Sequence, residues 1–423
     1  MPSTDPRSPI ISDDPAYDAV VVGGSLAGCA AATLLGRAGA RVAVVEKQPD
    51  PQAYKRMCSH FIQASGVPTL ERLGWLEPML EAGAIRTRVQ AWTRWGWIKP
   101  PPPGNVCVNL RREVLDPLMK ELTAEEAGVD LMLGWSAERV LRDDGTVRGV
   151  VARDRAGEEV ELRARLTVGA DGRDSQLAKL AGLPDKKTPH GRFAYGGYFE
   201  GAAPPTAPDA SFWMLDPQWA AAFPTDSDLT FYAVMGTKDR LPEFKADPAG
   251  ALVRFIADIP EAPPIRQGRL VGPVLGKVDM TNRQRGPVAP GLALVGDAAL
   301  AVDPLFGIGC GWALQSGEWL ADSVAPALGG EEPLQEGLKR YKRRHARGLG
   351  GHAFLINDYA TGRPMSPVER LVFSAAARDE RCASLFETFG TRQIGPERAF
   401  PRILPRAIAV NARHALARER SAA

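Results

Sequence analysis

The stretch Val22-Gly23-Gly24-Ser25-Leu26-Ala27-Gly28 lies between two segments with different hydrophobic patterns, and it decides the fold. Residues 19–22 are a short apolar run typical of a buried strand, whereas residues 26–37 are small residues typical of a packed helix. A second apolar run at 41–46 indicates another strand. The sequence therefore predicts a βαβ unit at the start of an α/β domain.

The glycines of this turn are those that a dinucleotide site needs. Such a site requires glycine where the chain turns sharply and where the backbone approaches a pyrophosphate at a helix N-terminus. Ser25 replaces the middle glycine of the fingerprint and is small enough to keep the site. Glu46 ends the second strand about 20 residues later, where an acid binds a ribose hydroxyl. We expect the nucleotide to contact Gly23, Ser25, Gly28, Glu46 and Lys47.

Composition limits the partners and the compartment. The chain has 423 residues and a net charge of +2, so it lacks the long-range positive field that holds nucleic acid. The five cysteines form no CxxC pair, which is typical of a cytoplasmic protein. Residues 19–36 carry no charge, but their glycines argue against a membrane span. Residues 1–16 are expected to be a disordered tail. A small-molecule ligand is the expected partner.

Two later segments also place glycine and aspartate directly after short apolar strands. The first is Val168-Gly-Ala-Asp-Gly-Arg-Asp-Ser175, and the second starts at Gly296-Asp297 and continues to Gly309. A carboxylate at a strand end can accept a hydrogen bond from a ligand hydroxyl, and a glycine-rich helix start offers free N–H groups. Three strand ends are therefore expected to meet at one elongated cofactor.

These three elements, in this order, resemble the FAD-dependent superfamily of aromatic hydroxylases, geranylgeranyl reductases and flavin halogenases. The resemblance implies that the first motif binds the ADP half of FAD, that Asp171 and Gly172 lie along the pyrophosphate, and that Asp297 binds the ribityl chain. Arg112, which opens an RxxL helix, and Arg56 match further flavin contacts of the family. The loop along the isoalloxazine ring is implied to contain Pro304, Gly307, Ile308 and Gly309.

The predicted fold is α/β, with a Rossmann-like FAD-binding domain of the GR2 type interleaved with a mostly antiparallel sheet that binds substrate. A small β-meander is expected before Thr167, an exposed polyproline connector at 100–103, and one covered face on the antiparallel sheet. The expected division of the chain is 17–88, 104–188 and 281–332 for the FAD domain, 89–103 and 189–280 for the sheet domain, and 333–423 for a helical C-terminal region.

The resemblance implies an oxidoreductase, and we expect a monooxygenase that hydroxylates or epoxidises a small aromatic or polyketide-like molecule. Family members of this kind use NAD(P)H, which docks transiently, and O₂, which forms a flavin C4a-hydroperoxide. A dry aromatic pocket would protect such chemistry from water. Candidate pocket walls are Tyr195, Tyr198, Trp213, Trp219, Phe223 and Tyr232. His60 is the candidate base for a phenolic substrate.

Three alternatives stay open at this point. A FAD-dependent reductase or dehydrogenase of the geranylgeranyl-reductase type is the main one, because the Lys55–Cys58 segment is similar to its KxCG motif and Phe223-Pro224 to its WxFP motif. A flavin halogenase is disfavoured, because the WxWxxP of Trp95–Pro100 precedes the GADG motif instead of following it. The third is a non-catalytic flavin-binding protein. The histidine spacings indicate no metal site. The oligomeric state is left open.

Overall fold

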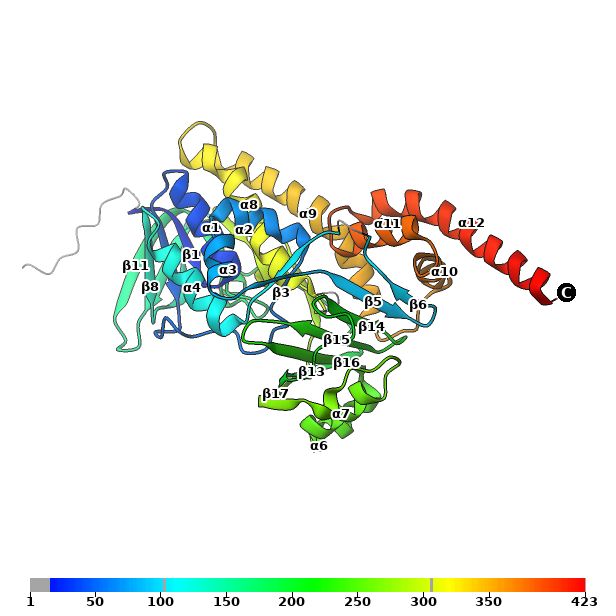
Figure 1. Ribbon diagram of the computed structural model, residues 1–423. Helices are drawn as coiled ribbons and strands as arrows, with labels where there is room; N and C mark the ends of the chain where they lie inside the picture. Colours follow the sequence, from blue (N-terminus) through cyan, green and yellow to red (C-terminus); the bar gives the residue numbers. More distant parts are fainter. Residues whose placement is uncertain (1–15, 102–103, 305–306, 423) are drawn as a thin grey trace, which may run out of the picture.

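The computed structural model describes residues 16–101, 104–304 and 307–422. Most of the expected N-terminal tail, Pro102–Pro103 and Leu305–Phe306 therefore lie outside the described residues. Figure 1 shows a parallel sheet under long helices, a second sheet beside it, and a group of C-terminal helices from which the last one projects. None of the helices in the described ranges is both long and apolar enough to cross a membrane.

The predicted βαβ unit is confirmed and starts the first sheet. Strand β1 pairs in parallel with β2 on one side and with β11 on the other, and the sheet order is β19-β20-β11-β1-β2-β8. Strands β9 and β10 extend β11 as an antiparallel meander, as predicted. The elements of this part are β1 (Tyr17–Val22), α1 (Leu26–Arg37), β2 (Val42–Glu46), α4 (Arg112–Ala124), β8 (Val129–Leu133), β9 (Ser136–Asp143), β10 (Thr146–Arg153), β11 (Glu159–Gly169), α5 (Gln176–Leu180), β19 (Val288–Ala289), β20 (Leu292–Leu294), η4 (Gly296–Ala298) and α8 (Gly309–Leu328).

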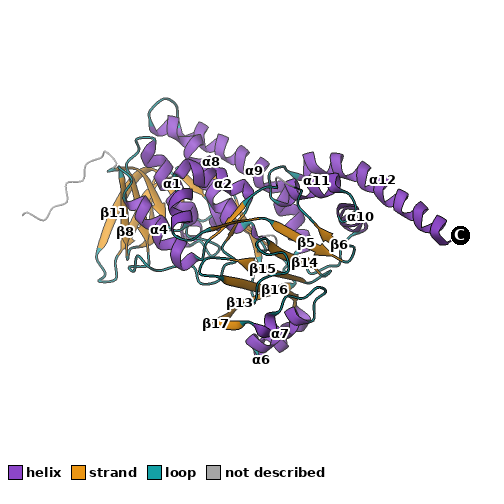
Figure 2. Cartoon of the chain, in the orientation of Figure 1, coloured by secondary structure: helices purple, strands orange, loops and turns teal. Residues whose placement is uncertain are grey.

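A seven-stranded, mostly antiparallel sheet forms the second layer (Figure 2). Its order is β17-β13-β16-β15-β14-β5-β6, and only the β14–β5 pair is parallel. Its strands are β5 (Val89–Thr93), β6 (Gly96–Ile98), β13 (Arg192–Glu200), β14 (Ala210–Met214), β15 (Trp219–Pro224), β16 (Leu229–Thr237) and β17 (Arg269–Lys277). Segments on both sides of α4 in the sequence thus share one sheet, while the domain boundaries themselves stay predictions.

Both faces of this sheet are covered, which corrects the expectation of one covered face. One face packs on α6 (Leu241–Ala246) and α7 (Pro248–Ala257) through a cluster that includes Phe244 and Phe255. The other face packs on the C-terminal helices through a cluster that includes Phe373. Strands β13, β14, β15 and β16 are consequently buried at nearly every position, as expected for a sheet between two apolar layers.

The remaining elements connect the two layers. Two small sheets have the orders β3-β7-β4 and β12-β18-β21. Their strands are β3 (Phe61–Ile62), β4 (Ile85–Thr87), β7 (Cys107–Asn109), β12 (Asp185–Thr188), β18 (Asn282–Arg285) and β21 (Leu300–Ala301). The short helices are η1 (Ala64–Gly66), α2 (Val67–Leu73), α3 (Leu76–Glu81), η2 (Lys238–Arg240) and η3 (Ile265–Gln267). Pro100 is buried, so this end of the predicted polyproline connector is not exposed.

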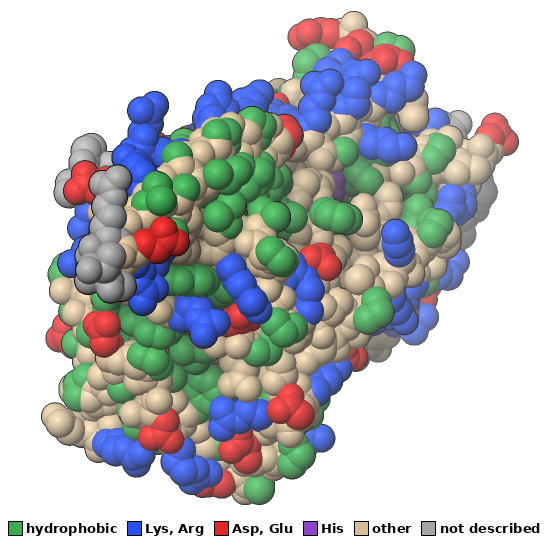
Figure 3. Space-filling model, turned by 90° about the vertical axis from the view of Figure 1, so that its right-hand side faces the viewer, with side chains coloured by type: hydrophobic (Ala, Val, Ile, Leu, Met, Phe, Trp, Pro, Cys, Tyr) green, Lys and Arg blue, Asp and Glu red, His purple; other side chains and the backbone are tan. Residues whose placement is uncertain are grey.

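The C-terminal region consists of α9 (Leu334–Tyr359), α10 (Pro367–Ala376), α11 (Glu380–Gly390) and α12 (Pro396–Ala422). Figure 3 shows the face of the molecule that forms the right-hand side of Figure 1. Lys and Arg gather along the upper edge of this face, with Asp, Glu and hydrophobic side chains among them. The mixture of signs agrees with the low net charge.

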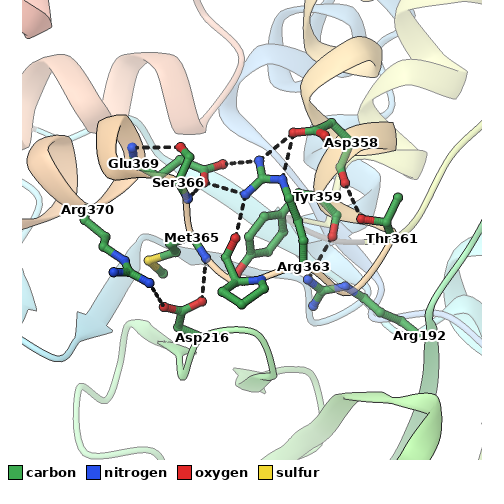
Figure 4. Close-up of polar contacts among 11 residues, drawn as sticks. Arg192, Asp216, Asp358, Tyr359, Thr361, Arg363, Met365, Ser366, Glu369 and Arg370 are labelled. Carbon is green, nitrogen blue, oxygen red and sulfur yellow. Dashed lines mark hydrogen bonds and ion pairs between the residues drawn. The ribbon is translucent and has the colours of Figure 1, made fainter.

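The turn between α9 and α10 fastens this region to the antiparallel sheet (Figure 4). The Arg363 guanidinium lies between Asp358 and Glu369, at 2.9 Å from Nε to Asp358 Oδ2 and 2.7 Å from Nη1 to Glu369 Oε2. The Met365 N–H donates to Asp216 Oδ1, in the β14–β15 turn, at 2.6 Å. Because one cation holds two carboxylates in a forked geometry, this turn is better fixed than an ordinary surface ion pair.

We expect Arg363→Ala to lower the free energy of unfolding by about 1–2 kcal/mol, because it leaves two half-exposed carboxylates without their shared cation. Arg370→Ala is the matched control: its guanidinium is 4.0 Å from Asp216 and its side chain is 48% exposed, so we expect less than about 0.5 kcal/mol. Urea unfolding followed by circular dichroism measures both. Equal losses in the two variants would contradict this role of Arg363.

Candidate active site

The turn between β1 and α1 is tight because two glycines leave no room for a side chain. Gly23 has φ +108°, and a Cβ there would lie 2.6 Å from the carbonyl oxygen of Ala170, at the end of β11. A Cβ on Gly28 would lie 1.9 Å from the Gly23 carbonyl oxygen. Ser25 is the N-cap of α1 but makes no side-chain cap bond. The turn therefore places the first N–H groups of α1 close to the ends of β1 and β11, where they have no side-chain partner from Ser25.

Glu46 supports this turn directly. Its Oε2 accepts from the Gly24 N–H at 2.8 Å, and its Oε1 accepts from the Gln48 N–H at 2.8 Å. Glu46 is half-buried at the end of β2, and the neighbouring Lys47 is exposed. The carboxylate is thus held beside the glycine turn, where the sequence places the ribose.

The GADGR segment forms a second wall. Asp171 accepts from the Ser175 hydroxyl at 2.6 Å and from the Leu177 N–H at 2.9 Å, so its carboxylate caps α5. Gly172 follows in a left-handed conformation, with φ +80°. The Arg173 guanidinium donates to the carbonyl oxygens of Thr281, at 2.8 Å, and of Val302, at 2.9 Å. This arginine therefore joins the segment to two other chain segments.

The third wall contains Asp297 and the start of α8. The Asp297 side chain is 31% exposed, and its Oδ2 lies 3.8 Å from Lys55 Nζ. Helix α8 has no side-chain cap at Ile308, and a Cβ on the exposed Gly309 would meet no atom within 4 Å. Gly307 has φ +63°, and a Cβ there would lie 3.2 Å from Phe61 Cδ1. Pro304 is exposed. The helix start is consequently open to a ligand.

These walls fit FAD. Helices α1 and α8 pack closely, since a Cβ on Gly317 would lie 2.8 Å from the Ala27 carbonyl oxygen, and neither helix has a side-chain N-cap. Uncapped helix N-termini bind phosphates and other electron-rich groups. Carboxylates at Glu46 and Asp297 suit the hydroxyls of ribose and of a ribityl chain. The N–H donors at the helix starts match the phosphates of a long ligand. The carboxylate acceptors Glu46 and Asp297 match hydroxyl groups at two further points along it.

Arg112 is a buried cation behind this site, with only 2% of its side chain exposed. Its Nε donates to Asp116 Oδ1 at 2.5 Å, and its Nη2 donates to the Ser25 hydroxyl at 2.9 Å. The Lys55 N–H donates to the other Asp116 oxygen at 2.9 Å. Arg112 therefore positions the glycine turn and the 54–60 segment together. Arg56, also expected at the flavin, is exposed.

Cys58 lies on the other side of the same guanidinium. Its Sγ accepts from the His60 N–H at 3.3 Å and is 3.9 Å from Arg112 Nη1 and 3.7 Å from Cys310 Sγ. The hydrogen bond with Cys310 lowers the pKa of the Cys58 thiol well below its usual range, and the positive charge of Arg112 acts in the same direction against the effect of burial. Cys58 is therefore a titratable thiol beside a buried cation.

Both ring nitrogens of His60, the candidate base, already have protein partners. The Arg112 N–H donates to its Nδ1 at 3.0 Å, and its Nε2 contacts the Tyr198 hydroxyl. Burial lowers the pKa of His60, so the ring is neutral, and since Nδ1 accepts, Nε2 carries the proton. Neither nitrogen offers a lone pair to a substrate. His60 is placed to orient the Tyr198 hydroxyl.

The six predicted pocket aromatics divide between the two faces of the antiparallel sheet. Alternate residues of a strand point to opposite faces. Those that pack toward α6 and α7, away from the FAD domain, are Tyr195, Trp213 and Tyr232, which corrects their assignment to the pocket. Trp219 packs against Phe212 and Tyr359. Tyr198 contacts His60, and Phe223 contacts Phe61 at 5.1 Å between ring centroids.

A largely apolar cavity lies on this second face. Its volume is ≈ 70 Å³. Its wall consists of Phe61, Gln63, Val89, Ala91, Ile98, Pro100, Phe212, Met214, Phe223, Phe386, Glu387, Gly390 and Thr391. Because Phe61 also contacts the Gly307 position, the cavity begins next to the loop expected along the flavin ring.

Several of these residues escaped the sequence analysis. Asp116 had a signal, since it stands four residues after Arg112 on one helix and can therefore pair with it. Phe61 follows His60 directly, but its apolar side chain carries no chemical signal. Phe386 and Glu387 come from a helix far along the chain, and only the fold brings them to the cavity.

Comparison with known proteins identifies the family. Residues 16–349 match the family described as FAD binding domain. The chain is 30% identical to digeranylgeranylglycerophospholipid reductase 2 of Methanopyrus kandleri over 349 residues, which cover 79% of this chain and 83% of that one. It is 32% identical to 6-methylpretetramide 4-monooxygenase of Streptomyces rimosus over 187 residues, 42% of this chain and 43% of that one.

The fold is also found in solved structures. Flavin-dependent brominase Bmp2 superposes with a TM-score of 0.77 at 19% identity, covering 95% of this chain and 99% of that one. The similarity extends over both sheets and supports the α/β fold class predicted from the sequence. Taken with the family match and with a site that fits the cofactor, it leads to one conclusion: the chain belongs to the FAD binding domain family and is a FAD-dependent oxidoreductase.

Proposed function

We propose that the protein is a monooxygenase that hydroxylates or epoxidises a small aromatic or polyketide-like molecule, with NAD(P)H as the transient reductant. The observation that carries this proposal is the apolar cavity that begins at Phe61, beside the Gly307 loop. Aromatic rings form much of its wall, and such a surface excludes water and favours a flat apolar substrate. The Streptomyces relative, a monooxygenase by name, supports the same reaction class.

Tyr198 packs in the cluster on the same face of the sheet as the cavity, although it is not one of the cavity's lining residues. Bound FAD would supply the activation of O₂, with electrons from NAD(P)H. The Tyr198 hydroxyl receives the proton of His60 Nε2, so its own O–H can donate to a substrate oxygen. Burial is the main reason that the pKa of Tyr198 is raised, so the phenol stays protonated and acts as a donor. Tyr198 would therefore orient a substrate hydroxyl or carbonyl.

A reductase of carbon–carbon double bonds is the second candidate, and the Cys58–Cys310 pair is the observation that favours it. Adding hydrogen across a double bond requires a proton donor. The hydrogen bond with Cys58, together with burial, raises the pKa of Cys310 well above its usual range, so Cys310 keeps a proton at the same site. The Methanopyrus relative, a reductase by name, covers more of the chain than the monooxygenase does.

Oxygen isotope labelling separates the two candidates. We expect a screen of phenols and aromatic polyketides with NAD(P)H under ¹⁸O₂ to yield a product with one ¹⁸O atom and NAD(P)H use that rises with substrate. A product gaining two hydrogens under strictly anaerobic conditions would support the reductase instead. A bound flavin that neither NADH nor NADPH reduces would contradict both.

We expect Asp297→Ala to weaken FAD binding about tenfold or more, because it removes the carboxylate placed for a cofactor hydroxyl, and a tenfold loss corresponds to about 1.4 kcal/mol. Asp174→Ala is the matched control, since the Asp174 side chain is 69% exposed on the GADGRD segment. Flavin fluorescence during titration of apoprotein measures both affinities. Full FAD retention by Asp297→Ala would refute the assignment.

The two cysteines Cys58 and Cys382 should differ in the pH at which iodoacetamide alkylates them. The thiolate is the nucleophile, and a lowered pKa keeps Cys58 in this form below the usual range, so its modification should be near its plateau at pH 8. Cys382 is fully buried, and burial raises its pKa to about 11, so it should stay unmodified up to pH 10. Mass spectrometry of peptides from FAD-loaded protein gives both profiles, and Cys58→Ser verifies the peptide assignment. A Cys58 profile that rises only above pH 9 would contradict the lowered pKa of Cys58 and, with it, the placing of the shared proton on Cys310.

A further inference from the structure

Two parts of the chain form the wall of the apolar cavity: the segment that matches the family and the C-terminal region beyond it. Strands β5, β6, β14 and β15 and the segment around Phe61 lie within residues 16–349, which match the family. The opposite wall is the C-terminal half of α11, beyond the match. Helix α11 is held in place at its start, where Asp379 accepts from the Cys382 N–H at 2.9 Å and from Arg406 Nε at 2.6 Å. The part of this chain outside the family segment therefore closes the cavity.

Glu387 is the one acidic residue of that wall. Its Oε1 accepts from the Asn105 N–H at 2.8 Å, which fixes the carboxylate against the 104–105 loop. Among the residues that the structure describes, no donor contacts its Oε2. The nearby cation Arg88 is engaged with Asp209, at 3.0 Å from Nη2 to Oδ2. A half-buried carboxylate thus lines the apolar cavity, with one oxygen fixed by Asn105 and the other without a donor among the described residues.

Such an oxygen can accept from a ligand. A ligand that covered it without donating a hydrogen bond would remove it from water at a cost of about 1–3 kcal/mol. Burial raises the pKa of Glu387, which reflects the same desolvation. Gln63 Nε2 and the Thr391 hydroxyl donate elsewhere, to the carbonyl oxygens of Gly390, at 3.3 Å, and of Glu387, at 2.8 Å. Glu387 lines the cavity from α11, whereas Phe61 lines it from the side of the Gly307 loop.

We propose that Glu387 is a specificity-determining residue, which binds a hydrogen-bond donor, an amine or a hydroxyl, on an otherwise apolar aromatic substrate. The substrate lies with its donor group at α11 and its apolar part toward Phe61. This inference rests on the proposed function, because it names the substrate class of the same site. Binding alone tests it, without turnover.

The probes are 2-phenylethylamine, 2-phenylethanol and ethylbenzene, which share a ring and differ in the terminal group. Isothermal titration calorimetry on the FAD-loaded protein measures their dissociation constants. We expect the amine, the alcohol or both to bind at least tenfold more tightly than ethylbenzene. Preference for the amine alone would identify a cationic substrate, and similar binding of both would identify a neutral donor. Equal affinity for all three, or no saturable binding of any, would overturn the proposal.

Four variants locate the effect. Glu387→Gln can still accept from the Asn105 N–H, so it should fold, keep the alcohol within threefold and lose a preference for the amine. Glu387→Leu should lose every preference while it keeps ethylbenzene. Phe386→Ala should weaken all three probes alike. Glu380→Gln, exposed on the same helix, should change nothing. A preference that survives in Glu387→Leu would overturn the proposal.

The binding test of Glu387 and the ¹⁸O₂ test of the monooxygenase can fail independently of each other. Incorporation of ¹⁸O by an enzyme without any probe preference would overturn the role of Glu387 and leave the monooxygenase intact. A clear preference in an enzyme that incorporates no oxygen would do the reverse.

Discussion

The buried guanidinium of Arg112 holds the site together. A charge with 2% exposure is tolerated only if it is paired, and Asp116 pairs it one turn along the same helix. Once the charge is neutralised, its other nitrogens connect the Ser25 turn with Cys58. The backbone N–H of the same residue fixes His60. Removing Asp116 would leave a buried charge without its partner, so the whole arrangement depends on this pair.

The same arginine explains why His60 could be found in the sequence but its chemistry could not. A histidine near a flavin motif suggests a titratable group, and only five histidines are present. Whether the ring accepts or donates depends on which neighbour reaches each nitrogen. Here the neighbour is the backbone of Arg112, 52 positions away, and a backbone N–H can only donate. A long-range contact thus changed a predicted base into an orienting donor.

The sequence could predict features set by neighbouring residues, but not those set by contacts between distant segments. Gly23 and Gly28 answer a local steric demand, so the motif located the cofactor turn. The aromatic residues lie on strands, where successive side chains point to opposite faces of the sheet, and the sequence does not show which face each one takes. Phe223 and Tyr232, in paired strands, consequently lie on opposite faces although both looked like pocket residues. Because the sheet is covered on both faces, aromatic content could not show which face meets the flavin.

The cofactor turn and the cavity wall at α11 differ in how strictly the fold constrains their side chains. Glycine turns and strand ends leave little freedom, because a side chain at Gly28 would collide with the backbone. The cavity wall at α11 carries no such demand: Phe386 and Glu387 stand on a helix surface where many side chains fit. Substitutions on this wall can therefore change the shape and polarity of the cavity without disturbing the tight turn at Gly23 and Gly28. If the cavity binds the substrate, as we propose, specificity depends on a helix surface that tolerates many side chains, whereas the turn before α1 does not.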